Sequence, residues 1–281
     1  MWFLAGLTAG LLLGSIGTLL LVLRWAVPRL ERAYVFRPSR DVLRTPEDLN
    51  LPYDQCFIDT PDGCRLAAWH VRPPNPIGSV VYFHGSTGNL GILVPILAQL
   101  YRGNLQVLAF DYRGYGLSTG TPTEEGVYLD AEAAARFFQA NFRESGIPVV
   151  YWGRSLGGCF AAAAAARVPP DGLILETTFP SKASLVSEFA QYRWFRWFAP
   201  CKLDTLSFLK DHPYPILVIH GEKDRTVPLR QGQILYQLLD PPKEFFWVPG
   251  AGHIDIHMVD SERYVQRVLQ FVTSLKPPRV H

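Results

Sequence analysis

A serine flanked by glycines at fixed spacing is the strongest chemical signal in the sequence. Residues 153–157 read Gly-Arg-Ser-Leu-Gly, and they follow an apolar run at 148–152 and precede an alanine-rich stretch. A strand, a tight turn and a helix in that order form the context in which Ser155 would project as a nucleophile. Small residues two before and two after it let neighbouring backbone pass close by. The pattern therefore indicates covalent catalysis by Ser155.

A serine nucleophile needs a base, and the base needs an acid that orients it. With this kind of turn, the order along the chain is serine, then carboxylate, then histidine. Asp224 follows the apolar run 215–219 and a short polar loop, so it lies beyond a predicted strand end. Glu222 is its neighbour in that loop, and Glu176, which ends the run 172–175, is the second candidate. We expect Asp224 to be the acid.

The base is expected from a histidine that follows the last apolar run. His253 comes directly after the glycine-containing loop 249–252, whose glycines let it carry an imidazole back over a sheet. His257 falls in the next helical stretch. The remaining histidines have a structural context or no supporting context: His70, His84, His212, His220 and His281. We therefore expect His253 to be the base.

Two backbone N–H groups are needed to stabilise the oxyanion of an acyl-transfer reaction. Leu156, the residue after the nucleophile, is expected to supply one of them. The loop at 83–89 follows an early predicted strand, and Ser86 is the expected second donor because its glycine neighbours leave the amide accessible. Asn89 is expected to cap the helix that follows.

Alternating apolar runs and helical stretches would position these residues. Short runs that are apolar on both faces fit buried parallel strands, and they lie at 79–83, 106–110, 148–152, 172–175, 215–219 and 244–248. Helices are expected between them, at about 91–102, 124–143, 155–167, 229–239 and 259–275. A hairpin at 54–60 and 64–72 precedes them. The fold class is therefore α/β, with a mostly parallel sheet covered by helices on both faces.

One segment, 177–213, interrupts this alternation because it is too long for a plain helical connection. It is rich in aromatic residues, and three interpretations stay open. It is a short cap or lid over a site at the strand ends, or a pair of amphipathic helices packed on the sheet. In the third, Arg193 and Arg196 rest with the aromatic side chains at a lipid surface.

The first residues predict a transmembrane anchor. Residues 2–23 carry no charge, and about 20 apolar residues suffice to cross a bilayer core as a helix. A cleaved signal peptide is the alternative, although it would have a positive start and a shorter apolar stretch. Arginines follow the run and none precedes it, at Arg24, Arg29, Arg32, Arg37, Arg40 and Arg44. The expected organisation is a single-pass anchor at 1–23, a basic neck at 24–50 and a catalytic domain at 51–281 on the cytoplasmic side of the membrane.

Composition excludes several classes of protein. Of the 281 residues, 48% are hydrophobic and 19% are charged. The hydrophobic share is enough to form a buried core, which excludes a wholly disordered chain. A net charge of +2 is too small to indicate a nucleic-acid-binding protein. The histidines are scattered, and the cysteines lack metal-binding spacing, so we expect no metal and no cofactor. Cys56 and Cys64 flank a predicted turn, where a disulfide is one option, and Cys159 fits a small core residue. The oligomeric state is left open.

Four segments in this order resemble the α/β-hydrolase superfamily, at 84–89, 110–118, 153–158 and 220–224. Within it they look most like the membrane-anchored ABHD13/ABHD17/Bem46-like group. The resemblance covers roughly 50–275, and Ser86 stands where many members carry asparagine. It implies Ser155 as nucleophile, Asp224 as acid and His253 as base, with a short cap and with ester, thioester or amide substrates.

The expected function is that of a serine hydrolase which forms an acyl-enzyme from ester or thioester substrates. The aromatic segment 177–213 and the anchor favour small acyl or lipid-like substrates. Two alternatives remain: a serine peptidase of the same fold, similar to an aminopeptidase, and a catalytically silent binding module tethered to the membrane.

Overall fold

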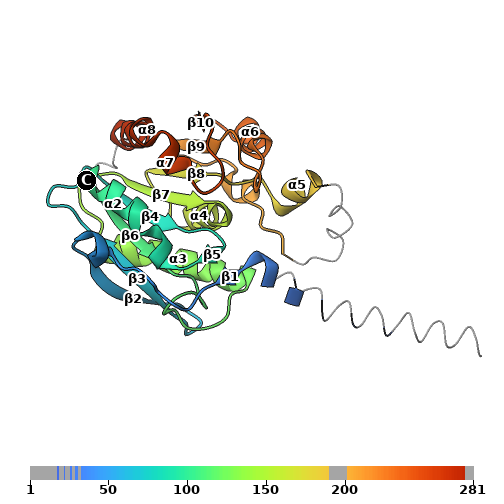
Figure 1. Ribbon diagram of the computed structural model, residues 1–281, viewed down its shortest axis with the longest axis horizontal. Helices are drawn as coiled ribbons and strands as arrows, with labels where there is room; N and C mark the ends of the chain where they lie inside the picture. The colour runs from blue at the N-terminus through green and yellow to red at the C-terminus, as the bar shows by residue number, and fades with distance from the viewer. Residues whose placement is uncertain are drawn as a thin grey trace, which may run out of the picture.

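An eight-stranded sheet forms the centre of the molecule (Figure 1). The computed structural model describes residues 33–189 and 201–275, and before them only Thr18, Val22, Ala26, Arg29 and Leu30. In spatial order the strands are β10 (Lys243–Val248), β9 (Ile216–Gly221), β8 (Gly172–Glu176), β7 (Val149–Arg154), β4 (Gly78–Phe83), β6 (Leu105–Phe110), β3 (Arg65–Val71) and β2 (Asp54–Asp59).

The sheet is mostly parallel, as predicted. Strands β10, β9, β8, β7, β4 and β6 run parallel to one another, while β2 pairs antiparallel with β3 and β3 pairs antiparallel with β6. Each apolar run of the sequence is one of the parallel strands, and the expected hairpin is β2–β3. Because the six strands are parallel, their carboxyl ends all lie at one edge of the sheet.

Helices cover both faces of the sheet, also as predicted. On one face lie α3 (Glu124–Asn141), α4 (Leu156–Arg167) and α6 (Leu229–Leu238), with Val81 and Phe83 of β4 beneath them. On the other face lie α2 (Val94–Arg102), α7 (Ile256–Val259) and α8 (Ser261–Ser274), against Val80 and Tyr82. The strands are buried on both sides, which explains why they read as unbroken apolar runs.

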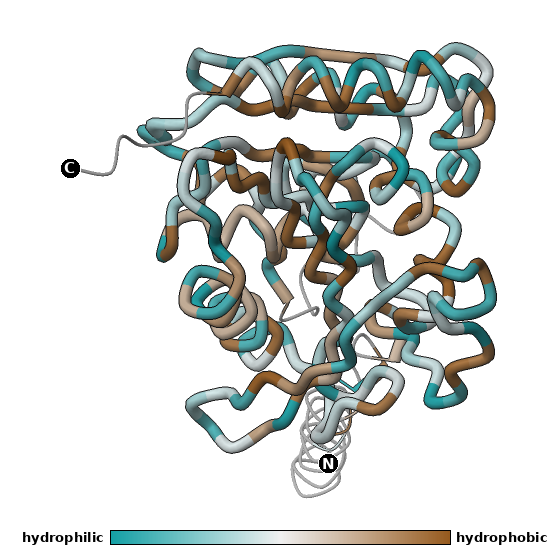
Figure 2. Tube along the Cα trace, turned by 90° about the vertical axis from the view of Figure 1, so that its left-hand side faces the viewer, coloured by the Kyte–Doolittle hydropathy of each residue, from teal (hydrophilic) through white to brown (hydrophobic). Residues whose placement is uncertain are grey.

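Helix α8 illustrates how amphipathic sequence positions a helix. Its buried residues, Tyr264, Val268, Phe271 and Val272, recur at helical spacing. Figure 2 shows the hydrophobic residues of this helix, at the top, on the side that faces the sheet. The helix expected at about 259–275 is α8, and the short α7 before it is a separate helix, because Asp260 between them has non-helical angles of φ −137° and ψ 63°.

The chain that precedes the sheet packs onto the domain from Phe36 onward. Phe36 is buried and stacks on Phe160 of α4, with ring centroids 6.3 Å apart. Strand β1 (Arg37–Pro38) then pairs in parallel with β5 (Thr87–Gly88). The Arg40 guanidinium donates to the carbonyl of Ser118. This part of the predicted neck is therefore joined to the loop that follows β4.

The anchor predicted at 1–23 lies outside the described residues except for Thr18 and Val22. Among the residues that are described, none of the helices combines the length and the apolarity that crossing a membrane requires.

The two described parts of the segment 177–213 are hydrogen-bonded to each other and to the domain. Its described parts contain α5 (Lys182–Ser187) and the short 3-10 helix η5 (Leu206–Leu209). Ser181 and Asp204 form an antiparallel bridge, and the Glu124 carboxylate accepts the backbone N–H groups of residues 202 and 203 at 2.7 and 2.6 Å. Residues 190–200, which include Arg193 and Arg196, lie outside the described part.

The cysteines form no disulfide within the described residues. Cys56 and Cys64 are free thiols, so the bridge that the sequence left as an option is not made. Cys159 is fully buried in the core, as expected, and burial raises the pKa of its thiol to about 12.

Candidate active site

Ser155 occupies a strained turn between β7 and α4. Its backbone angles are φ 53° and ψ −121°, a conformation that residues with a Cβ rarely adopt. The surrounding structure holds it there: the Ser155 N–H donates to the Glu176 carbonyl at 2.8 Å, and the Thr178 hydroxyl donates to the Ser155 carbonyl at 2.7 Å. The turn therefore presents the Ser155 side chain in the way that the sequence predicted.

Gly157 permits this turn because another backbone segment passes directly beside it. A Cβ placed on Gly157 would overlap the Phe83 carbonyl oxygen and come within 2.5 Å of the His84 carbonyl oxygen. These atoms belong to β4 and the loop after it. The glycine thus lets the loop that holds Ser86 lie against the nucleophile turn.

Gly157→Ala is therefore expected to destabilise the fold, although alanine suits a helix better than glycine does. Overpacking of this kind costs about 3 kcal/mol, so Tm should fall by roughly 6–12 °C in thermal unfolding. Gly146→Ala is the control, since it lies in a turn with no atom within 4 Å of a new Cβ and its φ of 85° adds backbone strain alone. Equal Tm values for the two variants would contradict the close approach.

Ser155, His253 and Asp224, the predicted nucleophile, base and acid, form a chain of hydrogen bonds. His253 Nε2 is 3.0 Å from Ser155 Oγ, and His253 Nδ1 is 2.7 Å from Asp224 Oδ2. The Asp224 side chain is fully buried. A carboxylate accepts a hydrogen bond from the Nδ1–H group, which keeps the proton on Nδ1 and leaves Nε2 free to accept the Ser155 hydroxyl proton. The arrangement can therefore abstract a proton from Ser155.

The sheet topology explains why residues so distant in sequence meet. Ser155 follows β7, Asp224 follows β9 and His253 follows β10, all at the carboxyl edge of the parallel strands. The loops after β9 and β10 are also bonded to each other, because the Lys223 N–H donates to the Ala251 carbonyl at 2.7 Å. This pairing keeps the carboxylate and the imidazole within reach.

Asp224 is itself oriented by its own loop. Its Oδ1 accepts the backbone N–H groups of Thr226 and Val227, each at 2.8 Å, which leaves Oδ2 to face His253. The neighbouring His220 Nε2 lies 3.6 Å from Oδ2 and donates to the Val227 carbonyl. Burial lowers the pKa of His220, so the residue is a neutral neighbour rather than a competing cation.

The other acids considered from sequence do not contact the His253 imidazole. Glu222 Oε2 accepts the Gly250 N–H at 2.9 Å and so ties the histidine loop to the loop after β9. Glu176 is buried and binds Trp152, Arg154 and Tyr264. Both carboxylates therefore have structural partners of their own.

His70, His212 and His257 make contacts of their own in the fold. His70 stacks on Phe142 with ring centroids 3.8 Å apart, and His212 lies within hydrogen-bond distance of the carbonyls of Tyr214 and Asp240. His257 lies on α7, and burial lowers its pKa. His281 lies outside the described residues.

The loop after β4 brings Ser86 beside the nucleophile. A Cβ on Gly85 would be 3.6 Å from Ser155 Cβ, which places this loop in contact with the turn. The Ser86 carbonyl accepts hydrogen bonds from the Arg37 N–H and the Tyr115 hydroxyl, both at 2.8 Å. Leu156 begins α4, as its expected role requires.

His84 also contacts this loop. The sequence predicted a structural role for His84 but not this contact. Its Nδ1 is 2.7 Å from the Gly85 carbonyl oxygen, and its Nε2 is 3.5 Å from Asp111 Oδ1. The Gly85 carbonyl and the Ser86 N–H belong to one planar peptide unit. His84 therefore helps to orient the N–H that is expected to face an oxyanion. Asn89 caps the next turn through Gly91, as predicted.

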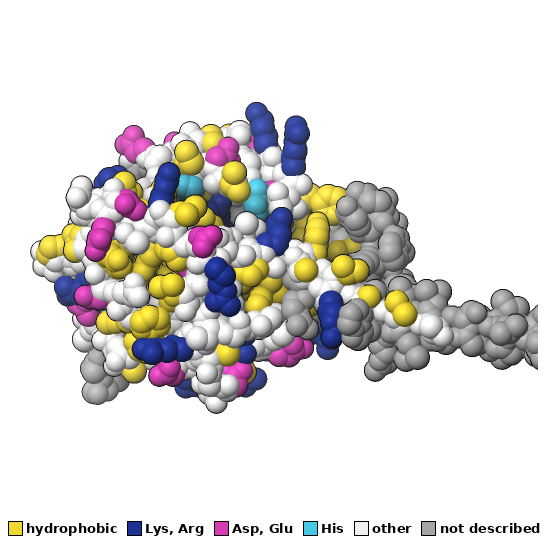
Figure 3. All heavy atoms as spheres, turned by 60° about the horizontal axis from the view of Figure 1, so that its bottom comes forward, with side chains coloured by type: hydrophobic (Ala, Val, Ile, Leu, Met, Phe, Trp, Pro, Cys, Tyr) yellow, Lys and Arg dark blue, Asp and Glu magenta, His cyan; other side chains and the backbone are white. Residues whose placement is uncertain are grey.

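One face of the molecule shows histidine side chains at the surface between hydrophobic and Lys or Arg side chains (Figure 3). Among the described histidines, His253 and His257 are the ones that are not buried. Ile254 and Met258, which follow them in the chain, are 75% and 67% exposed. Ser155 and His253 are therefore partly exposed, and the exposed Ile254 is the next residue after His253 in the chain.

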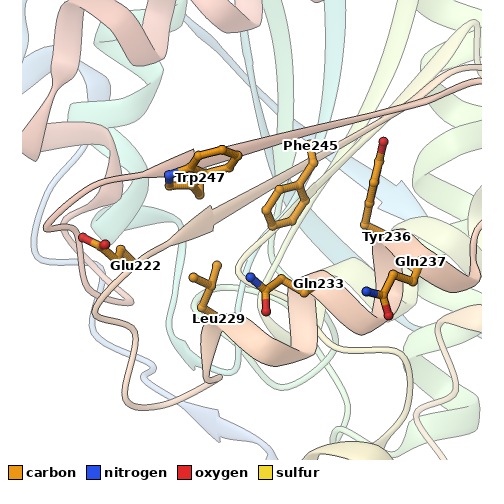
Figure 4. A pocket seen from close by; sticks show the side chains of 7 residues that line it. All are labelled: Glu222, Leu229, Gln233, Tyr236, Gln237, Phe245 and Trp247. Atoms are coloured by element: carbon orange, nitrogen blue, oxygen red, sulfur yellow. The ribbon is translucent and has the colours of Figure 1, made fainter.

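A separate groove of about 480 Å³ lies between α6 and β10 (Figure 4). It is lined by Glu222, Leu229, Gln233, Tyr236, Gln237, Phe245 and Trp247. None of the triad residues lines it. Elsewhere in the described part of the chain, no group of three or more His, Cys, Asp or Glu side chains is arranged to hold a metal ion.

Comparison with known proteins places these features in a wider group. Residues 74–207 match the Hydrolase_4 family model, which is described as serine aminopeptidase, S33. The chain is 30% identical to protein bem46 of Schizosaccharomyces pombe, over 83% of this chain and 81% of that protein. It is also 30% identical to human α/β hydrolase domain-containing protein 17B, over 78% and 75% of the two chains.

Solved structures share the fold. The esterase Pf2001 of Pyrococcus furiosus superimposes with a TM-score of 0.71 at 24% identity, over 86% of this chain and 99% of that one. An α/β hydrolase of Vibrio vulnificus has a TM-score of 0.70 at 20% identity, over 87% and 92% of the chains.

Proposed function

The chain belongs to the α/β-hydrolase family, in the group of Bem46 and ABHD17B, and on that premise we propose that it is a serine hydrolase with a Ser155–His253–Asp224 triad. One observation carries the proposal, the continuous chain of hydrogen bonds through the three side chains. Asp224 Oδ2 lies 2.7 Å from His253 Nδ1, and His253 Nε2 lies 3.0 Å from Ser155 Oγ. The strained turn at Ser155 supports the same role.

The proposed reaction has two halves. In the first, Ser155 Oγ attacks the substrate carbonyl carbon while His253 Nε2 takes the hydroxyl proton, and Asp224 stabilises the imidazolium that forms. His253 then gives this proton to the leaving alcohol or thiol as the acyl-enzyme forms. In the second half, His253 takes a proton from water, the resulting hydroxide attacks the acyl carbon, and Ser155 is released with its proton.

Negative charge on the carbonyl oxygen would be stabilised by the backbone N–H groups of Leu156 and Ser86. Leu156 lies at the N-terminus of α4, where the aligned peptide dipoles favour negative charge. His84 and Tyr115 keep the Ser86 loop in position through their bonds to neighbouring carbonyls. This stabilisation needs no metal and no cofactor.

We propose ester or thioester substrates with acyl or lipid-like groups. The exposed Ile254, which follows His253 in the chain, supports this, because an acyl chain gains from contact with apolar side chains. The uncharged run at 2–23 supports a single-pass anchor that would keep the domain at a cytoplasmic membrane surface. The segment 177–213 is the candidate cap.

A serine peptidase is the second candidate, and the description of the matching family model as a serine aminopeptidase favours it. A panel of substrates separates the two functions. The full-length chain should hydrolyse p-nitrophenyl acyl esters and acyl-CoA thioesters with kcat/KM at least roughly tenfold above that for tripeptide p-nitroanilides. The reverse order would identify a peptidase. A folded chain that hydrolyses none of them would be a silent binding module.

A further inference from the structure

We infer that Arg154 is a positioning residue which, together with Glu176, sets the distance between the imidazole of His253 and the hydroxyl of Ser155. The inference rests on the proposed function and deepens it. Arg154 occupies the variable position before the serine, where the sequence pattern places no constraint. Its role is assigned by the contacts of its side chain alone.

The Arg154 guanidinium joins the histidine loop to the sheet. Its Nη2 donates to the His253 carbonyl oxygen at 2.9 Å, and its Nε lies 3.3 Å from Glu176 Oε1. The side chain is only 16% exposed, so water competes little for these bonds. Because arginine has a planar fork of donors, one side chain can satisfy both acceptors at a fixed separation.

Glu176 is held rigidly in turn. Its Oε2 accepts hydrogen bonds from the Trp152 indole N–H at 3.0 Å and from the Tyr264 hydroxyl at 2.6 Å. The carboxylate therefore has three cationic or hydrogen-bonding partners and is almost fully buried. Because its partners lie on β7 and α8, the carboxylate is a fixed point in the core.

The same residue also fixes the nucleophile. The Glu176 carbonyl accepts the Ser155 N–H at 2.8 Å, while the Glu176 carboxylate pairs with Arg154. Glu176, at the end of β8, is thus connected to both catalytic loops. It bonds Ser155 directly through the backbone, and it reaches the His253 loop through Arg154. A change at Arg154 should therefore move the base relative to the nucleophile.

Net stability is a weak explanation for this buried pair. Buried ion pairs often contribute no more than apolar residues of the same size, because removing both charges from water offsets their attraction. Placement of a catalytic group, by contrast, has a steep effect on rate, and a shift of about 1 Å can reduce it by about a hundredfold.

Arg154→Met tests the inference, since methionine keeps much of the side-chain volume and loses both the hydrogen bond to the His253 carbonyl and the ion pair with Glu176. We expect kcat for a p-nitrophenyl ester to fall by about a hundredfold with KM changed less than about threefold. The downfield proton resonance of the His253 Nδ1–H, which reports its bond to Asp224, should shift or broaden. Arg154→Lys, which has one point charge instead of a fork, should lose about tenfold in kcat.

Arg143→Met is the matched control. Arg143 also pairs with a carboxylate, Asp171, at 3.4 Å, but Asp171 precedes β8 and so lies at the opposite end of that strand from Glu176. Its Tm should fall while kcat stays at the wild-type value. If Arg154→Met does not fold, the kcat of Arg154→Lys tests the inference in its place.

Wild-type kcat and an unshifted resonance in the folded Arg154 variant would overturn the inference. So would a fall in activity that matches the unfolded fraction. These outcomes are distinct from failure of the proposed function, in which the wild-type chain itself would neither hydrolyse esters nor react with a fluorophosphonate.

Discussion

Ser155→Ala is expected to lower kcat by about 10⁶-fold on every substrate of the wild-type chain, with the fold preserved. The substitution removes the attacking oxygen, which lies 3.0 Å from His253 Nε2. The backbone contacts of the turn remain, because they use the N–H and carbonyl of residue 155. Serine and alanine both carry a Cβ, so the strain at φ 53° is unchanged. Initial rates and thermal unfolding measure the two effects separately.

The control for this variant is Ser274→Ala, which removes a hydroxyl from the exposed end of α8. It should keep the wild-type kcat. If Ser155→Ala retained more than about a hundredth of the wild-type kcat, the activity would come from another group, and the covalent mechanism would be wrong.

Asp224→Asn is expected to lower kcat by about 10⁴-fold. Asparagine can still accept the N–H groups of Thr226 and Val227 through Oδ1, so the loop should keep its conformation. Its amide would present a donor to His253 Nδ1 in place of an acceptor. The imidazole would then carry its proton on Nε2 and could not accept one from Ser155.

Glu222→Gln is the matched control for the acid, because Glu222 lies in the same loop and was the neighbouring candidate. Glutamine can still accept the Gly250 N–H, so we expect kcat within about twofold of wild type. Loss of activity in Glu222→Gln with retention in Asp224→Asn would move the role of the acid to Glu222.

Much of the fold is predictable from local sequence. The parallel strands are apolar on both faces because helices cover both sides, and this burial is visible as six uninterrupted runs. The order of serine, carboxylate and histidine predicted which three residues meet. The structure brings Ser155, Asp224 and His253 within hydrogen-bond distance. Strand order, in contrast, depends on pairing between distant segments and was not predicted.

Other features depend on contacts that no local pattern encodes. Phe36 lies in an arginine-rich stretch that looked like a separate neck, yet it is buried against Phe160. The break between α7 and α8 follows from the backbone of Asp260, which is not a strong helix breaker by type. The bond from Arg154 to the His253 carbonyl joins residues far apart in the chain, and its acceptor is a backbone atom that any residue would carry.

The most direct measurement is the site at which a fluorophosphonate reacts with the wild-type chain. Such a probe transfers its phosphonyl group only to a serine that an adjacent base has activated. Intact mass should show one adduct per chain, peptide mapping should place it on Ser155, and an acyl ester should slow its formation. An adduct on a different residue, or a folded chain that hydrolyses esters without forming any adduct, would contradict the proposed triad.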